Sequence, residues 1–318
     1  MQGILIVDKP AGWTSFDVIA KLRGVLGTRK LGHSGTLDPM ATGVLPVFCG
    51  GASKAVDLQE NHDKTYRAVL RLGARTDTGD VTGTVLETAP VTAGEAELLA
   101  VLPRFVGPQT QLPPLYSAVK VNGVPLYKLA RQNSARLGGG AAPADAPDAA
   151  ARWAAAEQAA ARKPRPVTIY SIDYEGSPAP GEYVLRVACS KGTYIRTLLE
   201  DIAAAMGQKG TMSALRRVQA GVYGEQDAHP LEEILAAKAA GTLDTLLLPV
   251  DTVFAALPRL TVNDGVKRHL YNGCPTSNFR AADGRYRVYD LTGSFLGLAA
   301  VEQGVLQVEK LFVDRDAR

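Results

Sequence analysis

The stretch that most constrains this chain is residues 32–46, GHSGTLDPMATGVLP, which has neither a helical nor a strand period. Gly35 permits backbone angles that are closed to other residues, and Pro39 moves Asp38 out of the helical region. The apolar residues that follow predict a buried strand, so we expect a loop that holds the Asp38 carboxylate at a sharp bend. The alternative is that Asp38 is only a turn former, as an aspartate before proline commonly is.

Composition excludes several classes of protein. The chain has 318 residues, 46 % of them apolar and 21 % charged, which is ordinary for a globular protein that carries more than one domain. The net charge of +3 is compatible with a polyanionic partner without requiring one. The three cysteines are far apart and form no CxxC, so neither a disulfide framework nor a zinc site is expected. With no secretory signal and no apolar run long enough to span a bilayer, we expect a cytoplasmic protein with no membrane partner.

Hydrophobic periodicity predicts strands that alternate with helices. Thr14 and Ser15 can cap a helix that runs through Leu26. The other expected helices are 92–105, with Leu98, Leu99 and Leu102 on its inner face, 197–206 and 229–239. The expected strands are 3–7, one that begins near residue 64 and alternates from Tyr66 to Leu72, 115–121 before a hairpin turn at Asn122-Gly123, 166–174 and 182–189.

Two regions differ from this pattern. Residues 138–163 are rich in alanine, with Trp153 as the one large apolar side chain, which predicts a flexible surface insertion. From about residue 257 short strands follow one another at close spacing, separated by turns that contain glycine. This pattern predicts a small β-barrel-like module at the C-terminus.

Residues 32–43 closely resemble the catalytic motif of the TruB-type tRNA pseudouridine-55 synthases, G-H-x-G-[TA]-L-D-P-x-A-T-G. Three further segments match that family in order, namely DKPAGWTSFDV, KTYRAVLRLGARTDTGD and SKGTYIRTLLEDI. An ordered set of four motifs is far more specific than any one of them. The resemblance covers most of residues 3–250, and the insertion at 138–163 departs from it.

The resemblance implies a fold and a domain division. The fold class would be α/β (α+β), with a catalytic domain at 1–250 that contains a mixed, mainly antiparallel sheet. A small PUA-like β-barrel that binds RNA would follow at 257–318. The resemblance also implies the reaction, in which uridine-55 in the T loop of tRNA is flipped out and isomerised to pseudouridine. The expected partner is the T arm of tRNA, and the enzyme would be a monomer that needs no cofactor, metal or obligatory protein partner.

Asp38 and Arg196 are the expected charged pair of the site. Detaching a base and rejoining it through carbon needs a group that stays ionised at neutral pH, as an aspartate does with its ordinary pKa near 4. Burial against a base would raise that pKa, so a cation should lie beside it. The resemblance implies that Arg196 is this cation. From the residues alone, an ordinary surface ion pair is the favoured interpretation of Arg196. Whether Asp38 attacks the base or the sugar stays open.

Tyr66 and Tyr194 are the expected aromatic residues of the site. Flipping a base out of its stack costs a few kcal/mol, and stacking on an aromatic ring returns on the order of 1–3 kcal/mol. The resemblance implies that Tyr66 stacks on the flipped uracil. It implies that Tyr194 contacts the base edge and takes part in moving the C5 proton. The alternative for both is a strand tyrosine half-buried in the core.

The resemblance assigns further substrate-binding roles. His33 would fill the gap that the extruded base leaves, Asp80 would support the site, and Leu215 would pack on the base pocket. Lys9 and Lys191 would lie near the RNA, although the residues alone make Lys9 an ordinary surface lysine. Basic residues flank these motifs and would neutralise phosphates if they cluster in space, namely Arg67, Arg71, Lys191, Arg216 and Arg217.

Two other functions fit parts of the sequence. His33, Ser34 and Asp38 are the residue types of a hydrolase triad, but they lie within six residues of one loop and no GxSxG elbow is present. The second alternative is an RNA-binding protein that remodels tRNA without chemistry. Replacement of Asp38 by Asn separates the isomerase from this RNA-binding protein, because modification should vanish while tRNA binding persists. An acyl-ester assay on a Ser34→Ala variant tests the hydrolase.

Overall fold

The computed structural model describes residues 2–117, 119–121, 124–126 and 162–313. The insertion expected at 138–163 lies outside the described residues except for its last two positions. The chain falls into two compact units, which we call the first unit (Met1–Pro39, Gly43–His62 and Ala220–Arg318) and the second unit (Met40–Thr42 and Asp63–Gln219). The division into domains at 1–250 and 257–318 stays a prediction.

The sheet of the first unit is built around a nearly continuous apolar strand, β1 (Gly3–Lys9). β3 (Thr42–Cys49) pairs with it antiparallel along its whole length, and β14 (His229–Pro230) pairs with it parallel. Two short antiparallel strands also pair here, β2 (Leu31–His33) beside β3 and β15 (Leu247–Leu248) beside β1. A strand with few polar residues is typical of a sheet that is covered on both faces.

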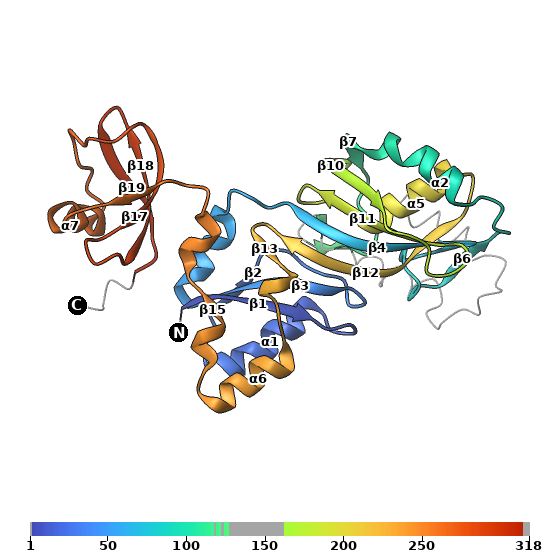
Figure 1. Ribbon diagram of the computed structural model, residues 1–318, viewed down its shortest axis with the longest axis horizontal. Helices are drawn as coiled ribbons and strands as arrows, with labels where there is room; N and C mark the ends of the chain where they lie inside the picture. Colours follow the sequence, from blue (N-terminus) through green and yellow to red (C-terminus); the bar gives the residue numbers. More distant parts are fainter. Residues whose placement is uncertain (1, 118, 122–123, 127–161, 314–318) are drawn as a thin grey trace. The chain divides into compact units, whose positions relative to one another are not determined.

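Both faces of this sheet are covered, because successive side chains of a strand point to opposite sides. Leu5 and Val7 pack against the helices α1 (Ser15–Leu26) and α6 (Leu231–Ala240), which lie on one face (Figure 1). Ile4 and Ile6 pack on the other face against the 3₁₀ helices η1 (Gly50–Leu58) and η5 (Val250–Phe254).

The start of α1 confirms the predicted cap. The Thr14 hydroxyl accepts a hydrogen bond from the Asp17 N–H at 3.0 Å, and the Asp17 carboxylate accepts one from the Thr14 N–H at 2.8 Å. This reciprocal pair satisfies two of the N–H groups that a helix leaves open at its start. The helix ends at Gly27, whose φ of 63° is accessible to glycine at little cost.

The sheet of the second unit has the strand order β12-β4-β11-β10-β7. These strands are β12 (Gly210–Ala220), β4 (Lys64–Leu72), β11 (Glu182–Cys189), β10 (Arg165–Tyr174) and β7 (Gly107–Gln111). Pairing from β4 to β7 is antiparallel throughout. α5 (Ile195–Ala205) packs on β4, and α2 (Glu95–Val101) packs on α5 (Figure 1). The predicted α/β class with mixed, mainly antiparallel sheet pairing is confirmed.

Two predicted elements differ from the structure. The helix expected at 92–105 is shorter, since α2 is followed by a 3₁₀ turn, η2 (Leu102–Phe105). Leu99, which was expected on the inner face, is exposed because it lies about 100° around the helix from the buried Leu98. The strand expected at 115–121 is reduced to β8 (Lys120–Val121), since the chain bends over residues 115–117. β8 pairs with β9 (Val124–Pro125) on either side of the predicted turn, whose two residues lie outside the described part. The remaining short hairpin joins β5 (Ala74–Thr76) to β6 (Val85–Thr88).

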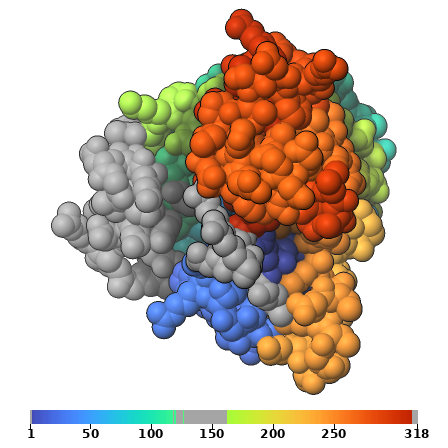
Figure 2. All heavy atoms as spheres, turned by 90° about the vertical axis from the view of Figure 1, so that its left-hand side faces the viewer, coloured from blue at the N-terminus to red at the C-terminus, as the bar shows by residue number. Residues whose placement is uncertain are grey.

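The C-terminal strands form a four-stranded sheet of order β16-β17-β18-β19. The elements here are β16 (Arg259–Thr261), α7 (Asp264–Asn272), β17 (Gly284–Tyr289), β18 (Phe295–Glu302) and β19 (Val305–Leu311). Among the described residues no pairing joins β16 to β19, so the expected barrel-like module of short strands is present as a sheet that does not close. Leu270 of α7 packs into the apolar cluster of this sheet, and a covering helix makes closure of the sheet unnecessary for burial. Figure 2 looks onto this region, whose atoms form one rounded, orange-to-red mass.

Candidate active site

The stretch around Asp38 is an irregular loop that connects β2 to β3 in the first unit. Its glycines take backbone angles that favour glycine, with φ of 129° at Gly35 and 101° at Gly43. The Asp38 side chain is half-buried, and its neighbour Leu37 is buried in the core. The chain bends at Ser34 and Gly35 and turns at Pro39 and Met40, on either side of Asp38 and not at the predicted place before Pro39, and the predicted buried strand follows as β3.

A buried lysine fixes the chain on one side of Asp38. Lys9 is fully buried, and its ammonium donates to the carbonyl oxygens of Pro10 at 2.9 Å, Trp13 at 2.6 Å and Pro39 at 3.2 Å. The Gly12 N–H also donates to the Pro39 carbonyl, at 2.8 Å. Lys9 is therefore not the exposed surface lysine that the residues alone suggested. Its location near RNA stays a prediction.

A buried serine fixes the chain on the other side of Asp38. The Leu37 N–H donates to the hydroxyl oxygen of Ser15 at 2.9 Å, and Ser15 is the first residue of α1. The residues before and after Asp38 are thus both bonded to the segment that connects β1 to α1. A backbone bonded on both sides limits the directions in which the carboxylate can point.

His33, at the end of β2, is bonded to its own loop. The Gly35 N–H donates to Nδ1 of the His33 ring at 3.3 Å, so this nitrogen acts as an acceptor. A neutral imidazole that accepts at Nδ1 carries its proton on Nε2. The predicted roles of His33, either beside the RNA or in a hydrolase triad, stay predictions.

In the second unit Arg196 is buried, with 5 % of its surface exposed. It is the second residue of α5, and its guanidinium donates to the Thr78 carbonyl at 2.6 Å and to the Tyr116 carbonyl at 2.8 Å. The alternative that Arg196 forms an ordinary surface ion pair is therefore wrong. The pairing of Arg196 with Asp38 that the family resemblance implies stays a prediction.

Asp80 shapes the loop that supplies one of the carbonyls bound by Arg196. Its carboxylate accepts hydrogen bonds from the Thr78 hydroxyl at 2.9 Å and from the Thr82 N–H at 3.0 Å, and it is buried. The same loop is bonded to β12 through Gly79 and Met212, since the Met212 N–H donates to the Gly79 carbonyl at 3.0 Å. Asp80 thus lies where it can support Arg196 through the backbone of Thr78.

The aromatic and apolar candidates of the second unit lie on neighbouring elements. Tyr66 is on the buried side of β4, and Leu215 is buried on the adjacent strand β12. Tyr194 is half-buried and directly precedes α5 as its N-cap residue. The burial of Tyr66 is also what a core tyrosine would show, so that alternative stays open.

The basic residues that flank the motifs do not share one environment. Lys191 is exposed, whereas Arg217 is fully buried and cannot face phosphates from its present position. Arg67 and Arg71 form ion pairs on the exposed side of β4 with Glu175 and Glu182. The hypothesis that the five form one phosphate-binding cluster is therefore wrong for Arg217.

Lys64 is a charged residue near the site that the sequence analysis did not identify. Burial at the start of β4, together with the positive charge of Arg217, lowers its pKa from 10.5 to about 8. Arg217 is more than 150 positions away in the sequence, so no local sequence signal could have shown this lowered pKa. Gln111, at the end of β7, was missed for the same reason.

The described residues offer neither a metal site nor a membrane span. No group of three or more His, Cys, Asp or Glu side chains in this part of the chain is placed to hold a metal ion. Nor is any helix in the described ranges long and apolar enough to cross a membrane.

Known proteins resemble this chain over nearly its whole length. The family model described as the N-terminal domain of TruB family pseudouridylate synthase matches residues 23–136, and that of the tRNA pseudouridylate synthase B C-terminal domain matches residues 196–255. A protein named tRNA pseudouridine synthase B from Ralstonia pickettii (strain 12J) is 40 % identical, covering 98 % of this chain and 94 % of the relative. Another protein of that name, from Pseudomonas fluorescens (strain Pf0-1), is 39 % identical, and the match covers 95 % of this chain and 92 % of the relative.

The fold of this chain is similar to that of solved structures. A chain in the "Crystal Structure of a Cbf5-Nop10-Gar1 Complex" superimposes with a TM-score of 0.69 at 23 % identity, covering 99 % of this chain and 86 % of that one. A chain in the "Structure of H/ACA RNP bound to a substrate RNA containing 2'-deoxyuridine" gives 0.68 at 21 % identity, with 99 % and 86 % covered. At these identities the likeness shows the fold alone.

Proposed function

This chain belongs to the TruB family of pseudouridine synthases, and we propose that its substrate is uridine-55 in the T loop of tRNA. The chain is a tRNA pseudouridine synthase, an isomerase that converts uridine in tRNA to pseudouridine. The observation that carries this conclusion is the 40 % identity with a tRNA pseudouridine synthase B over 98 % of the chain. The match of residues 32–43 to the family's catalytic motif supports the choice of nucleotide.

Asp38 carries the covalent step in this proposal. The isomerisation breaks the bond from N1 of uracil to C1′ of the ribose, forms a bond from C5 to C1′, and moves one proton from C5 to N1. A carboxylate with its ordinary pKa near 4 is ionised at neutral pH and can form a transient covalent bond with the substrate. The bonds of Leu37 to Ser15 and of Pro39 to Lys9 support this role, since they fix the backbone on both sides of the carboxylate.

Tyr66, Tyr194 and Arg196 complete the proposed catalytic set. A flipped uracil loses its stacking partners, and a tyrosine ring can replace them at a gain of about 1–3 kcal/mol. We assign the stacking to Tyr66 and contact with the base edge to Tyr194, which would assist transfer of the C5 proton. Arg196 would keep the Asp38 carboxylate ionised. The burial of Arg196 supports this role, because a desolvated guanidinium acts more strongly on a nearby charge than an exposed one.

The remaining candidates bind the RNA or support the site in this proposal. His33 would occupy the space that the flipped base leaves in the T loop, and Leu215 would pack on the base. Asp80 would position Arg196 through Thr78, as its hydrogen bonds allow. Lys191 is exposed and could contact a phosphate, whereas the buried Lys9 would act by holding the loop.

The proposed partner is the T arm of tRNA alone. The chain would act in the cytoplasm as a monomer without an obligatory protein partner. The structural relatives named above were solved in complexes with other proteins, so this part of the proposal is tested by measuring the mass of the active protein in solution. An active species with the mass of one chain is expected, and activity confined to a larger species would contradict it.

The test of the proposed function is to incubate the protein with an unmodified tRNA transcript and to map each pseudouridine in the product. One pseudouridine at position 55 is the expected result. A transcript with cytidine at that position serves as the control and should remain unmodified. Pseudouridine at another position would overturn the choice of nucleotide, and its complete absence would overturn the isomerase assignment.

A further inference from the structure

Gln111 is a buried polar residue to which the proposed mechanism gives no role. It is the last residue of β7, and only 2 % of its surface is exposed. β7 pairs in register with β10, where Gln111 lies opposite Arg165, so its backbone belongs to a regular sheet. A primary amide at such a depth needs partners for both its oxygen and its nitrogen.

Both polar atoms of the Gln111 side chain bind the main chain of Tyr194. The Tyr194 N–H donates to Oε1 of Gln111 at 3.0 Å, and Nε2 of Gln111 donates to the Tyr194 carbonyl at 3.4 Å. Two bonds of opposite direction to the same residue fix its position and its orientation together. The shorter bond, to the N–H, is the stronger of the two.

The position of Tyr194 explains why such a support is needed. Tyr194 is the N-cap residue of α5, with an extended backbone (φ −101°, ψ 107°), and its own side chain makes no capping bond. An N–H at this position has no partner within the helix. Gln111 supplies that partner and leaves the phenol ring of Tyr194 uninvolved in the contact.

The segment that follows Gln111 supports the next functional side chain as well. The carbonyl of Tyr116, five residues further on, accepts from the guanidinium of Arg196 at 2.8 Å. Residues 111–116 therefore contact Tyr194 through its main chain and Arg196 through its side chain. These are the two residues at the start of α5 to which the proposed function gives catalytic roles.

We propose that Gln111 is a positioning residue for the isomerisation, which acts by orienting the main chain of Tyr194. The inference rests on the proposed function, because it gains its meaning from the role of Tyr194 at the base. Loss of the two bonds lets the start of α5 shift, and a displacement of about 1 Å at a reacting group can cost about 10²-fold in rate. The binding of tRNA depends on a much larger surface and changes little.

The test compares Gln111→Met with Gln109→Met. Methionine has the length of glutamine and removes both bonds to Tyr194. Gln109 lies on the same strand and donates to the Phe105 carbonyl at 2.8 Å, so its substitution controls for the loss of a glutamine from β7. We measure the single-turnover rate at saturating enzyme and the Kd for unmodified tRNA. Gln111→Met is expected to lower the rate by about 10- to 100-fold and to change Kd by less than about threefold, whereas Gln109→Met leaves both within about twofold.

Gln111→Glu tests the mechanism in a second way. One oxygen of the glutamate still accepts from the Tyr194 N–H, but the other faces the Tyr194 carbonyl, so ionisation of this buried group is opposed by burial and by that carbonyl. The rate should therefore rise toward that of wild type as the pH falls and the carboxyl becomes a protonated donor. Amide exchange of the peptide that contains Tyr194 should be faster in Gln111→Met than in wild type, in protein shown to be folded by its circular dichroism. This exchange measurement applies even if one variant is poorly active for another reason.

Three results would overturn the inference. They are a wild-type rate in Gln111→Met, a fall in tRNA binding as large as the fall in rate, and unchanged amide exchange at Tyr194 in the folded variant. Failure of the proposed function is distinct, since wild type itself would then form no pseudouridine.

Discussion

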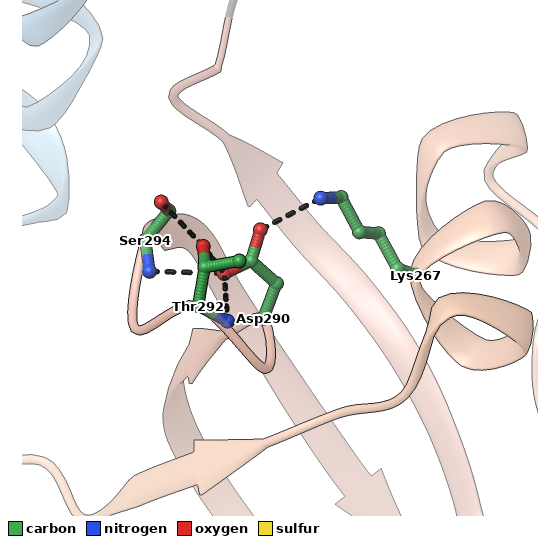
Figure 3. A network of polar contacts seen from close by, with 4 residues as sticks. All are labelled: Lys267, Asp290, Thr292 and Ser294. Carbon is green, nitrogen blue, oxygen red and sulfur yellow. Dashed lines mark hydrogen bonds and ion pairs between the residues drawn. The ribbon is translucent and has the colours of Figure 1, made fainter.

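Two turns of the first unit are each organised by one buried charged side chain, but the charges are opposite. At the turn through Pro39, the Lys9 ammonium donates to the Pro39 carbonyl and also to the carbonyls of Pro10 and Trp13, which lie between β1 and α1. At the turn between β17 and β18, the Asp290 carboxylate accepts from the N–H groups of Thr292 and Ser294, both at 3.0 Å, and from the Lys267 ammonium at 2.7 Å (Figure 3). An ammonium can donate only to acceptors, so Lys9 binds backbone carbonyls. A carboxylate can only accept, so Asp290 binds backbone N–H groups.

The difference lies in what each turn carries. The Lys9 turn contains Asp38, the residue to which we assign the covalent step, whereas the turn at 290–294 contains no residue of the proposed site. Loss of Lys9 should therefore reduce both stability and catalysis, and loss of Asp290 should reduce stability alone. The comparison shows that a charged side chain bonded to the main chain can hold a proposed catalytic residue at one turn and stabilise only the fold at another.

Among the substitutions that test this comparison of the two turns, the largest effect is expected for Lys9→Met. Removing the ammonium takes this donor from the partly buried carbonyls of Pro10 and Trp13, while the Pro39 carbonyl keeps its bond from the Gly12 N–H, and the loss lowers the free energy of unfolding by about 3 kcal/mol. The loop can then shift, and pseudouridine formation is expected to fall by about 10²-fold. Lys21→Met, on the exposed face of α1, is the matched control and should match wild type in denaturant unfolding and in rate. A Lys9→Met protein with wild-type stability and rate would contradict the claim that Lys9 holds the loop that carries Asp38.

The next effect is expected for Asp290→Asn. Its hydrogen bonds to Lys267 and Thr292 keep the pKa of the Asp290 carboxyl well below its usual range. Because the folded-state pKa is lowered, the stabilisation is present above the unfolded pKa near 3.9 and is lost as the pH falls toward the folded value. Asp290→Asn should lower the free energy of unfolding by about 2 kcal/mol at pH 7, and the difference from wild type should shrink below about pH 4. Pseudouridine formation at 25 °C should be unchanged.

The control for Asp290→Asn is Asp283→Asn in the same region. Asp283 is exposed and accepts from the Gln303 N–H at 3.0 Å, which an asparagine oxygen can also do. Its unfolding should match wild type at both pH values. A difference between wild type and Asp290→Asn that does not depend on pH would show that the carboxylate charge has no part in holding this turn.

The smallest effect is expected for Arg67→Met, which removes an ion pair that is not buried. Nε of Arg67 lies 2.7 Å from Oε2 of Glu175, and 56 % of the Arg67 side chain is exposed. Exposed pairs contribute about 0–1 kcal/mol and are screened by salt. The free energy of unfolding should change by less than about 1 kcal/mol, and still less in 1 M salt. A larger loss of unfolding free energy that does not depend on salt would contradict this expectation. It would mean that an exposed charge can stabilise the fold as much as the buried charges of Lys9 and Asp290 do.

Local patterns predicted much of the fold, and tertiary contacts account for what was missed. The cap at Thr14, the alternation from Tyr66 to Leu72 and the buried strand after Pro39 depend on neighbouring residues, which the sequence shows directly. The burial of Lys9 depends on the carbonyl of Pro39, thirty positions away, and that of Arg196 on Thr78 and Tyr116. No periodicity encodes such partners, which is why both residues resemble surface cations in the sequence. Gln111 was missed for the same reason.

The central claim is that the Asp38 carboxylate carries the chemistry, and Asp38→Asn tests it most directly. Asparagine keeps the size of the side chain and removes its charge and its nucleophilic oxygen. On unmodified tRNA, pseudouridine formation is expected to fall by about 10⁴-fold or more, while the Kd for tRNA stays within about threefold of wild type. An Asp38→Asn protein that still forms pseudouridine at a rate near wild type would contradict the account.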